Sequence, residues 1–285
     1  TVPSSYPTSS PGSNTFNGIT YSPYTTGSCL NLEQIEAQLK AVAGYTNNIR
    51  LYGADCNQVE NVLKAIVKNN LDIKVLLGVW TREGEARYQN EVSTIVKVLQ
   101  NASYRSIVIG VTVGNEEVFH GQSCASVCKY VNSARAQLTS SGISGLPVST
   151  VDVYKSWDTE LINCSDIIYA NIYPFFTAKY GDGSISTAVN GLFTELDVMK
   201  KKYSISKEIR ISESGWATDG TGAVTFGPAN IENQCEFLTQ FQCQAKKHQY
   251  PYYIMEAYDA PWKGGESCEK HFGIFGADSK LKCKS

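Results

Sequence analysis

Several residue types and patterns are scarce in this 285-residue sequence, and each scarcity argues against a class of protein. Lys and Arg total 25 against 27 Asp and Glu, so there is no basic surplus of the kind that binds nucleic acid. No stretch approaches the roughly 20 apolar residues of a membrane-spanning helix. Only three His residues and no paired C-x-x-C motif leave a zinc site without support. We therefore expect no nucleic-acid partner, no membrane span, no metal and no cofactor.

Cysteine, by contrast, is abundant, with nine residues in the chain. Disulfides formed in an oxidising compartment explain this number better than a zinc site does. The odd count leaves at least one thiol unpaired within the chain. We expect at least three disulfides. Cys268–Cys283 is the first pairing expected, because it would tie down the C-terminal tail over a short loop.

Other features of the sequence fit a secretory route. Two Asn-x-Ser sequons begin at Asn101 and Asn163. The chain starts at Thr1 without Met, as a processed protein would. Residues 1–14 are rich in Ser, Pro and Thr and are expected to form a flexible leader ahead of a single domain over 15–285. We predict a secreted protein of the extracellular space or cell wall, and a monomer.

Short apolar runs alternate with helical patterns along residues 15–285, as expected for buried parallel strands joined by helices. The apolar runs, predicted as strands, are 15–22, 48–53, 72–80, 106–114, 146–153, 166–175, 208–216 and 251–259. The predicted helices are 30–43, 56–70, 88–100, 123–140, 185–202 and 229–248. Eight strands in one domain predict an α/β fold of the (β/α)8 TIM-barrel type. A doubly wound sheet is the rival, but no Gly-rich phosphate turn follows the first strand.

Two acidic residues stand where predicted strands end. Glu116 follows the fourth strand and Glu213 ends the seventh. In a barrel the active site collects at the carboxyl ends of the strands, so both acids can point into one cleft. Paired carboxylates in a cleft can cleave a glycosidic bond, with one protonating the leaving oxygen and the other attacking or activating water.

Four motifs resemble those of glycoside hydrolase family 17, and they occur in the order and on the strands expected for that family. They are I-R-L-Y-G at 49–53, V-G-N-E at 113–116, N-I-Y-P at 171–174 and S-E-S-G-W at 212–216. Three further segments, 18–24, 52–59 and 257–263, resemble the fungal cell-wall branch of that family. The resemblance implies a retaining barrel enzyme that acts on β-1,3-glucan and laminari-oligosaccharides.

Carried over by this resemblance, Glu116 is the general acid/base and Glu213 the nucleophile. Asn115 is placed to bind the sugar 2-hydroxyl, and Tyr52 and Tyr173 resemble the tyrosines that flank the nucleophile. A retaining enzyme needs its two carboxyl groups about 5 to 5.5 Å apart. It also needs a raised pKa at Glu116, so that this residue holds a proton while Glu213 attacks as an anion.

Further residues near strand ends are candidates for binding the glucan. Aromatic rings stack on the apolar faces of sugars, and five are placed to do so: Trp157, Phe175, Phe176, Trp216 and Trp262. Glu256, Asp259 and Lys263 form either a polar subsite or a buried ion-pair network. For Glu117 we expect a supporting role, exposed or paired with an arginine.

The sequence leaves the final step of the reaction open. Water at Glu213 would make the protein an endo-β-1,3-glucanase, and a second glucan end would make it a β-1,3-glucanosyltransferase, which the fungal resemblance favours. A different class, a glucan-binding or structural wall protein without activity, does not account for the two acids and their neighbours. The sequence does not indicate the linkage formed or the preferred oligosaccharide length.

Overall fold

The computed structural model describes residues 15–283, so the leader predicted over 1–14 lies outside the described part. Nine parallel strands form one sheet in the order β7-β6-β5-β4-β1-β11-β10-β9-β8. The strands are β1 (Ile19–Thr20), β4 (Asn48–Arg50), β5 (Lys74–Val79), β6 (Val108–Val113), β7 (Val148–Ser149), β8 (Val151–Val153), β9 (Ile168–Asn171), β10 (Ile209–Ser214) and β11 (Tyr252–Ile254). Each of the eight predicted strands contains at least one of them.

The ring closes through the fifth predicted strand, which is divided at Thr150. Its first half, β7, pairs with β6, and its second half, β8, pairs with β9. Between the halves, the Thr150 amide donates 3.3 Å to Oγ of Ser165 and not to a strand. One segment thus bonds to both of its neighbours in turn, and the predicted (β/α)8 barrel is confirmed as a single domain.

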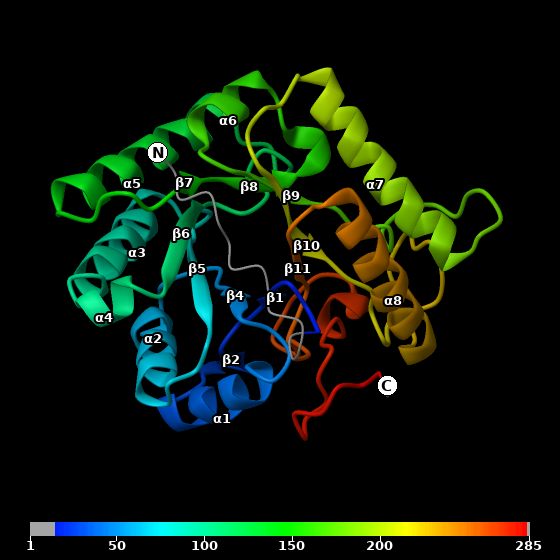
Figure 1. Cartoon of the computed structure of the whole chain (residues 1–285), viewed down its shortest axis with the longest axis horizontal. Coiled ribbons are helices and arrows are strands. Elements are labelled where there is room, and N and C mark those ends of the chain that lie inside the picture. The colour runs from blue at the N-terminus through cyan, green and yellow to red at the C-terminus, as the bar shows by residue number, and fades with distance from the viewer. Residues whose placement is uncertain (1–14, 284–285) are drawn as a thin grey trace.

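Helices surround the strands in chain order (Figure 1). They are α1 (Leu32–Val42), α2 (Gln58–Lys68), α3 (Glu85–Val98), α4 (Ala102–Arg105), α5 (Cys124–Ser140), α6 (Thr159–Cys164), α7 (Ile185–Lys202) and α8 (Ile231–His248). The six predicted helices are confirmed, while the short α4 and α6 were not predicted. A small hairpin of β2 (Tyr24–Thr25) and β3 (Ser28–Cys29) follows β1.

Alternation along the strands divides the apolar side chains into two clusters. The larger one packs the outward residues of the strands against the helices. The smaller one fills the inside of the barrel and consists of Leu76, Val151, Ile167, Tyr169 and Tyr253. Since every second strand residue points inward, the polar residues that continue these rows towards the carboxyl ends meet at the mouth of the barrel.

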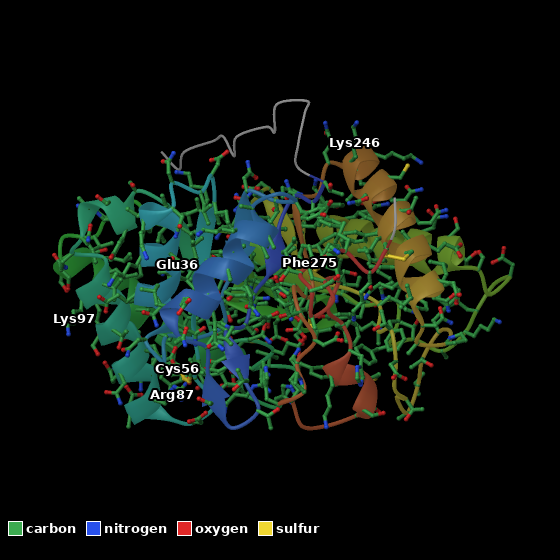
Figure 2. The ribbon with its side chains drawn as sticks, turned by 90° about the horizontal axis from the view of Figure 1, so that it is seen from below. Glu36, Cys56, Arg87, Lys97, Lys246 and Phe275 are labelled. Carbon is green, nitrogen blue, oxygen red and sulfur yellow. A yellow bond between two sulfur atoms is a disulfide. The ribbon has the colours of Figure 1, made fainter. Side chains whose placement is uncertain are left out.

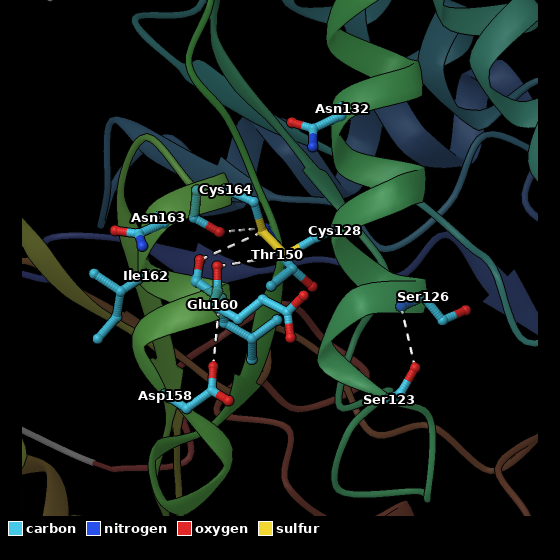
Figure 3. Close-up of a disulfide and its surroundings, with 12 residues drawn as sticks. Ser123, Ser126, Cys128, Asn132, Thr150, Asp158, Glu160, Ile162, Asn163 and Cys164 are labelled. Carbon is cyan, nitrogen blue, oxygen red and sulfur yellow. Dashed lines mark hydrogen bonds between the residues drawn. A yellow bond between two sulfur atoms is a disulfide. The ribbon is translucent and has the colours of Figure 1, made fainter.

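Three disulfides hold loops and helices around the barrel. Cys29–Cys56 joins the hairpin to the segment before α2, beside Arg87, whose Nη2 lies 3.0 Å from Oδ2 of Asp55 (Figure 2). Cys128–Cys164 joins α5 to α6 (Figure 3). The expectation of three disulfides is confirmed.

The predicted Cys268–Cys283 pairing is wrong. Cys283 bonds instead to Cys235 on α8, because the C-terminal segment returns across that helix. Cys268 is a free, fully buried thiol, and burial raises its pKa to about 11.

No helix in residues 15–283 is both long and apolar enough to cross a membrane.

Candidate active site

Glu116 is presented by a sharp turn at the end of β6. Gly114 has a φ of +78°, and a Cβ there would lie 2.7 Å from Cγ of Glu117, so only glycine fits this position. Glu116 itself has a φ of +61°, a left-handed conformation that non-glycine residues rarely adopt. Its amide donates to the carbonyl oxygen of Val151 at 2.9 Å, which fixes the turn against β8. Strained backbone held in this way is typical of functional residues.

Glu213 lies within β10, where the register with β9 shifts between Ile211 and Glu213. The side chain is buried and receives two hydrogen bonds. Nη1 of Arg50 donates to Oε1 at 2.7 Å, and the hydroxyl of Tyr173 donates to Oε2 at 2.7 Å. A donor on each oxygen fixes the orientation of this side chain. The predicted contact between Tyr173 and Glu213 is therefore present.

An amide pair connects the two acids. Nδ2 of Asn171 donates to Oε1 of Glu116 at 2.8 Å and to Oδ1 of Asn115 at 3.3 Å. Nη2 of Arg50 donates to the same Oδ1 at 2.8 Å. Arg50 thus contacts both Glu213 and Asn115. These contacts place Glu116 and Glu213 in one continuous hydrogen-bond network, and they orient the Asn115 amide so that its Nδ2 can donate to a sugar hydroxyl.

The charge state of Glu116 follows from its surroundings. Burial raises its pKa to about 7, the negative charge of Glu213 adds to the rise, and the hydrogen bond from Asn171 opposes it. A carboxyl group with this pKa holds its proton through much of the neutral range, as a general acid must. The predicted rise in the Glu116 pKa is confirmed.

Tyr52 contacts Arg50, the partner of Glu213, and makes no hydrogen bond to Glu213 itself. Its ring packs under the guanidinium of Arg50, with Cζ 4.5 Å from the ring centroid. Its hydroxyl is buried near Thr20 and makes no hydrogen bond of normal geometry to a described residue. Burial and the charge of Glu213 raise the pKa of Tyr52 well above 10, so this hydroxyl stays protonated.

Glu117 has the supporting role that was predicted for it. Its side chain is buried, with Oε1 3.5 Å from Nε of Arg82. Nη2 of Arg82 also donates to the carbonyl oxygen of Asn115. The pair therefore fixes the backbone on either side of Glu116.

The comparisons with known proteins agree with this geometry. The profile of the BtgE/BtgC glycoside hydrolase domain matches residues 18–273 of the chain. The chain belongs to this family. The resemblance to glycoside hydrolase family 17 is thereby confirmed, since a crystal structure titled as a family 17 β-1,3-glucanosyltransferase from Rhizomucor miehei superposes with a TM-score of 0.80. That structure is 27% identical and covers 95% of this chain and 96% of its own.

Curated relatives of this glycoside hydrolase domain come from Aspergillus and a related fungus. A protein of Aspergillus clavatus named "Probable glucan endo-1,3-beta-glucosidase btgC" is 30% identical over 94% of the chain. A protein of Emericella nidulans named "Glucan endo-1,3-beta-glucosidase btgC" is 27% identical over 87%. The chain spans 42% of the first relative's length and 41% of the second's, so each contains a further region that the chain does not match.

The aromatic residues predicted to bind sugar divide into two groups in the glycoside hydrolase domain. Trp157, Phe175 and Trp216 are at most 1% exposed and pack in the core, so the prediction that these three stack on glucan is wrong. Phe176 and Trp262 are partly exposed, and their predicted sugar contacts stay predictions. The sequence shows that an aromatic residue follows a strand, but not which way the chain then turns.

Ion pairs hold the side chains of Glu256, Asp259 and Lys263. Of the two roles predicted for these residues, a polar subsite or an ion-pair network, the contacts fit the second. Nζ of Lys263 lies 2.6 Å from Oε1 of the buried Glu256, whose pKa is raised by burial against the pull of this lysine. Asp259 pairs at 2.9 Å with Lys282 and accepts from the amide of Gly273. The first pair lies within the segment after β11, and the contacts of Asp259 tie that segment to the C-terminal part of the chain.

Two functional residues were missed from the sequence. Arg50 and Asn171 lie inside motifs that were recognised, yet neither was given a role. The available signal was polarity: each is a polar residue inside a largely apolar run that is predicted to be buried, where a polar side chain requires a buried partner. The partners come from strands distant in sequence, and the motifs alone could not identify them.

One group of side chains among the described residues has the spacing of a metal site. Sγ of Cys124 and the carboxylates of Asp158 and Glu160 lie within 4.8 Å of one another. The three residues lie at the first turns of α5 and α6, and Figure 3 shows Asp158 and Glu160 near the Cys128–Cys164 disulfide. Burial, a hydrogen bond with Asp158 and the neighbouring carboxylates raise the pKa of Cys124 to about 11, so the thiol is protonated at neutral pH when no cation is bound.

Proposed function

We propose that this domain cleaves β-1,3-glucan through a covalent glycosyl-enzyme and transfers the glycosyl unit to a second glucan. The observation that carries the proposal is the unequal environment of two linked acids. Glu116 has a pKa of about 7, while Glu213 is held by Arg50 and Tyr173. One residue is suited to give a proton and the other to attack as an anion.

In the first step, Glu213 attacks the anomeric carbon and Glu116 gives its proton to the glycosidic oxygen. The carbon–oxygen bond breaks, the leaving glucan departs as an alcohol, and an ester to Glu213 forms. In the second step, Glu116, now a carboxylate, takes a proton from an incoming hydroxyl as that oxygen attacks the same carbon. The ester breaks, and the configuration at the anomeric carbon is retained overall.

Transfer and hydrolysis differ only in the incoming hydroxyl. The Rhizomucor miehei protein to which the chain is similar is described as a β-1,3-glucanosyltransferase, which supports transfer. The fungal relatives are named glucan endo-1,3-beta-glucosidases, which supports hydrolysis as the second candidate. A non-catalytic wall protein is disfavoured, because a buried acid with a raised pKa beside an anion is costly without a chemical use.

Product analysis tests the proposal. The protein is incubated with laminarihexaose, and the products are separated by length. Products longer than six sugars indicate transfer, shorter products alone indicate hydrolysis, and unchanged hexaose contradicts both. The first-formed product should carry a β-anomeric centre by NMR, whereas an α-anomer would mean inversion and a wider separation of the carboxyl groups than the 5 to 5.5 Å proposed.

We also propose that the protein acts outside the cell, at or near a glucan wall, as a monomer. Its three disulfides support an oxidising compartment. Fractionation of culture medium and wall, with size-exclusion chromatography of the purified protein, tests these two points.

A further inference from the structure

Phe119 is the most exposed large hydrophobic side chain among residues 15–283, with 61% of its surface accessible. Leaving a phenylalanine in water forfeits the free energy that its burial would provide. Single exposed hydrophobic residues are common, so exposure alone assigns no role. The position of Phe119 distinguishes it, because it lies three residues after the acid Glu116.

The backbone that carries Phe119 is rigidly held. The buried carboxylate of Asp152, on β8, accepts from the amides of Val118 at 2.8 Å and Phe119 at 3.2 Å. One residue further on, the amide of His120 donates to the carbonyl oxygen of Glu116 at 3.0 Å. An exposed ring on a fixed backbone is preorganised for binding, because little entropy remains to be lost when a ligand orders it.

His120 lies between Glu116 and the ring of Phe119 and contacts both. Oε1 of Glu116 accepts from Asn171, whereas Oε2 lies 3.9 Å from Nε2 of His120. The His120 ring packs edge-on against Phe119, with centroids 5.2 Å apart. Phe119 therefore lies beyond the oxygen that is free to protonate a leaving group. Burial and Arg82 lower the pKa of His120, so this contact places an uncharged ring beside Glu116 at neutral pH.

We propose that Phe119, positioned by His120 and Asp152, is the stacking platform for the sugar on the leaving-group side of the cleaved bond. A β-linked glucose carries its hydroxyls around the ring edge and presents an apolar face that an aromatic ring can cover. Because the incoming hydroxyl of the second step enters where the leaving group departed, the same platform receives the acceptor. This inference rests on the proposed function and names the ligand of one of its subsites.

The test compares two donors that differ in their leaving group. Laminarihexaose leaves a sugar in the proposed subsite, whereas β-laminaribiosyl fluoride leaves only fluoride. Phe119→Ala should lower kcat/KM on laminarihexaose about three- to tenfold, because a stacking contact is lost. The rate of fluoride release should change less than about twofold. Phe119→Trp should restore the rate on laminarihexaose.

Controls separate loss of the platform from loss of the fold. Val198→Ala removes another exposed apolar side chain, from α7, and should leave both donors unaffected. Phe119→Leu keeps apolar bulk without a flat face, and it should reproduce the difference between donors even if the alanine variant folds poorly. Where the wild type transfers, Phe119→Ala should also raise the acceptor concentration needed for half-maximal transfer.

The outcomes distinguish failure of the proposed Phe119 platform from failure of the proposed function. Equal losses on both donors would mean that Phe119 supports the fold or Glu213 and not a sugar, and unchanged rates on laminarihexaose would exclude the platform. A loss on laminarihexaose together with a shifted basic limit of its pH profile would mean that Phe119 acts through Glu116, whereas the platform leaves that limit near the Glu116 pKa of about 7. Each of these three results overturns the inference while the proposed function stands. Inactivity of the wild type on both donors overturns the proposed function, and the platform with it.

Discussion

The surroundings of Glu213 and those of Glu116 differ, although both side chains are carboxylates at the mouth of the same barrel. Glu213 is buried and receives charged and hydroxyl donors from Arg50 and Tyr173, one on each oxygen. Glu116 receives one amide hydrogen bond on Oε1, and its side chain keeps 20% of its surface accessible. The comparison teaches that the neighbours assign the chemical role of each residue, since the two side chains are identical.

The strand ends explain how the difference arises. Glu213 belongs to the strand β10, and its two partners, Arg50 on β4 and Tyr173 after β9, come from other parts of the barrel wall. Glu116 lies beyond its strand, on a turn stabilised by Gly114 and by the amide bond to Val151. A wall position suits a nucleophile that must stay in place. A turn at the rim suits an acid that must reach the leaving group.

Removing the nucleophile should have the largest effect. Glu213→Gln should lower the turnover of every donor by about 10⁴-fold or more, because no other carboxylate can form the glycosyl-enzyme. Rates on laminarihexaose and on β-laminaribiosyl fluoride check this. Substantial activity on the fluoride would contradict the assignment of Glu213.

Removing the acid should have a smaller effect that depends on the leaving group. Glu116→Gln should lower kcat on laminarihexaose by about 10²- to 10⁴-fold, the usual contribution of a general acid. Formation of the glycosyl-enzyme from the fluoride needs no proton and should be largely preserved. Added azide, which needs no general base, should then resolve the ester and give a β-glycosyl azide. Losses equal to those of Glu213→Gln, without rescue, would contradict the division of roles.

The two tyrosines provide a matched pair of smaller changes. Tyr173→Phe removes a hydrogen bond to the Glu213 carboxylate, worth about 1.5 to 3 kcal/mol, and should lower kcat/KM about ten- to 100-fold. Tyr52→Phe removes a buried hydroxyl that makes no hydrogen bond to Glu213, and should lower kcat/KM less than about threefold. Equal losses in the two variants would show that Tyr173 has no special relation to the nucleophile.

The pH dependence sharpens the comparison further. Glu116 must be protonated for the first step, so activity on laminarihexaose is present below its pKa of about 7 and falls as pH rises through that value. The fall should approach tenfold per pH unit above pH about 8. Initial fluoride release should lack this basic limb. The same limb on both donors would mean that a different group titrates.

Much of the fold could be predicted from the sequence, because buried parallel strands and amphipathic helices leave strong local patterns. All eight strand runs and six helices appear where the pattern placed them. The break at Thr150 could not be predicted, since it depends on how the ring closes. The partner of Cys283 was likewise hidden, because the return of the C-terminal segment across α8 is a tertiary feature.

The candidate site was predictable in its acids and less so in its surroundings. Glu116 and Glu213 lie in recognisable motifs at the carboxyl ends of strands, which is where the active sites of barrel enzymes form. Arg50 and Asn171 act through contacts between strands, which no local pattern contains. Trp157 and Phe175 were assigned to sugar because they follow strands, yet both turn into the core. The direction in which such a side chain points depends on the conformation of the loop after the strand, which local sequence patterns do not predict.

Trapping the glycosyl-enzyme tests the central claim most directly. A 2-deoxy-2-fluoro-β-laminaribiosyl fluoride should react with the wild type and accumulate as an ester, since the 2-fluorine slows both steps while the good leaving group speeds only the first. Peptide mass spectrometry should then find the sugar on Glu213, within the segment ISESGW. Label on Glu116 would reverse the roles assigned here. An unlabelled protein that still turns over laminarihexaose to an α-anomeric product would contradict the covalent mechanism.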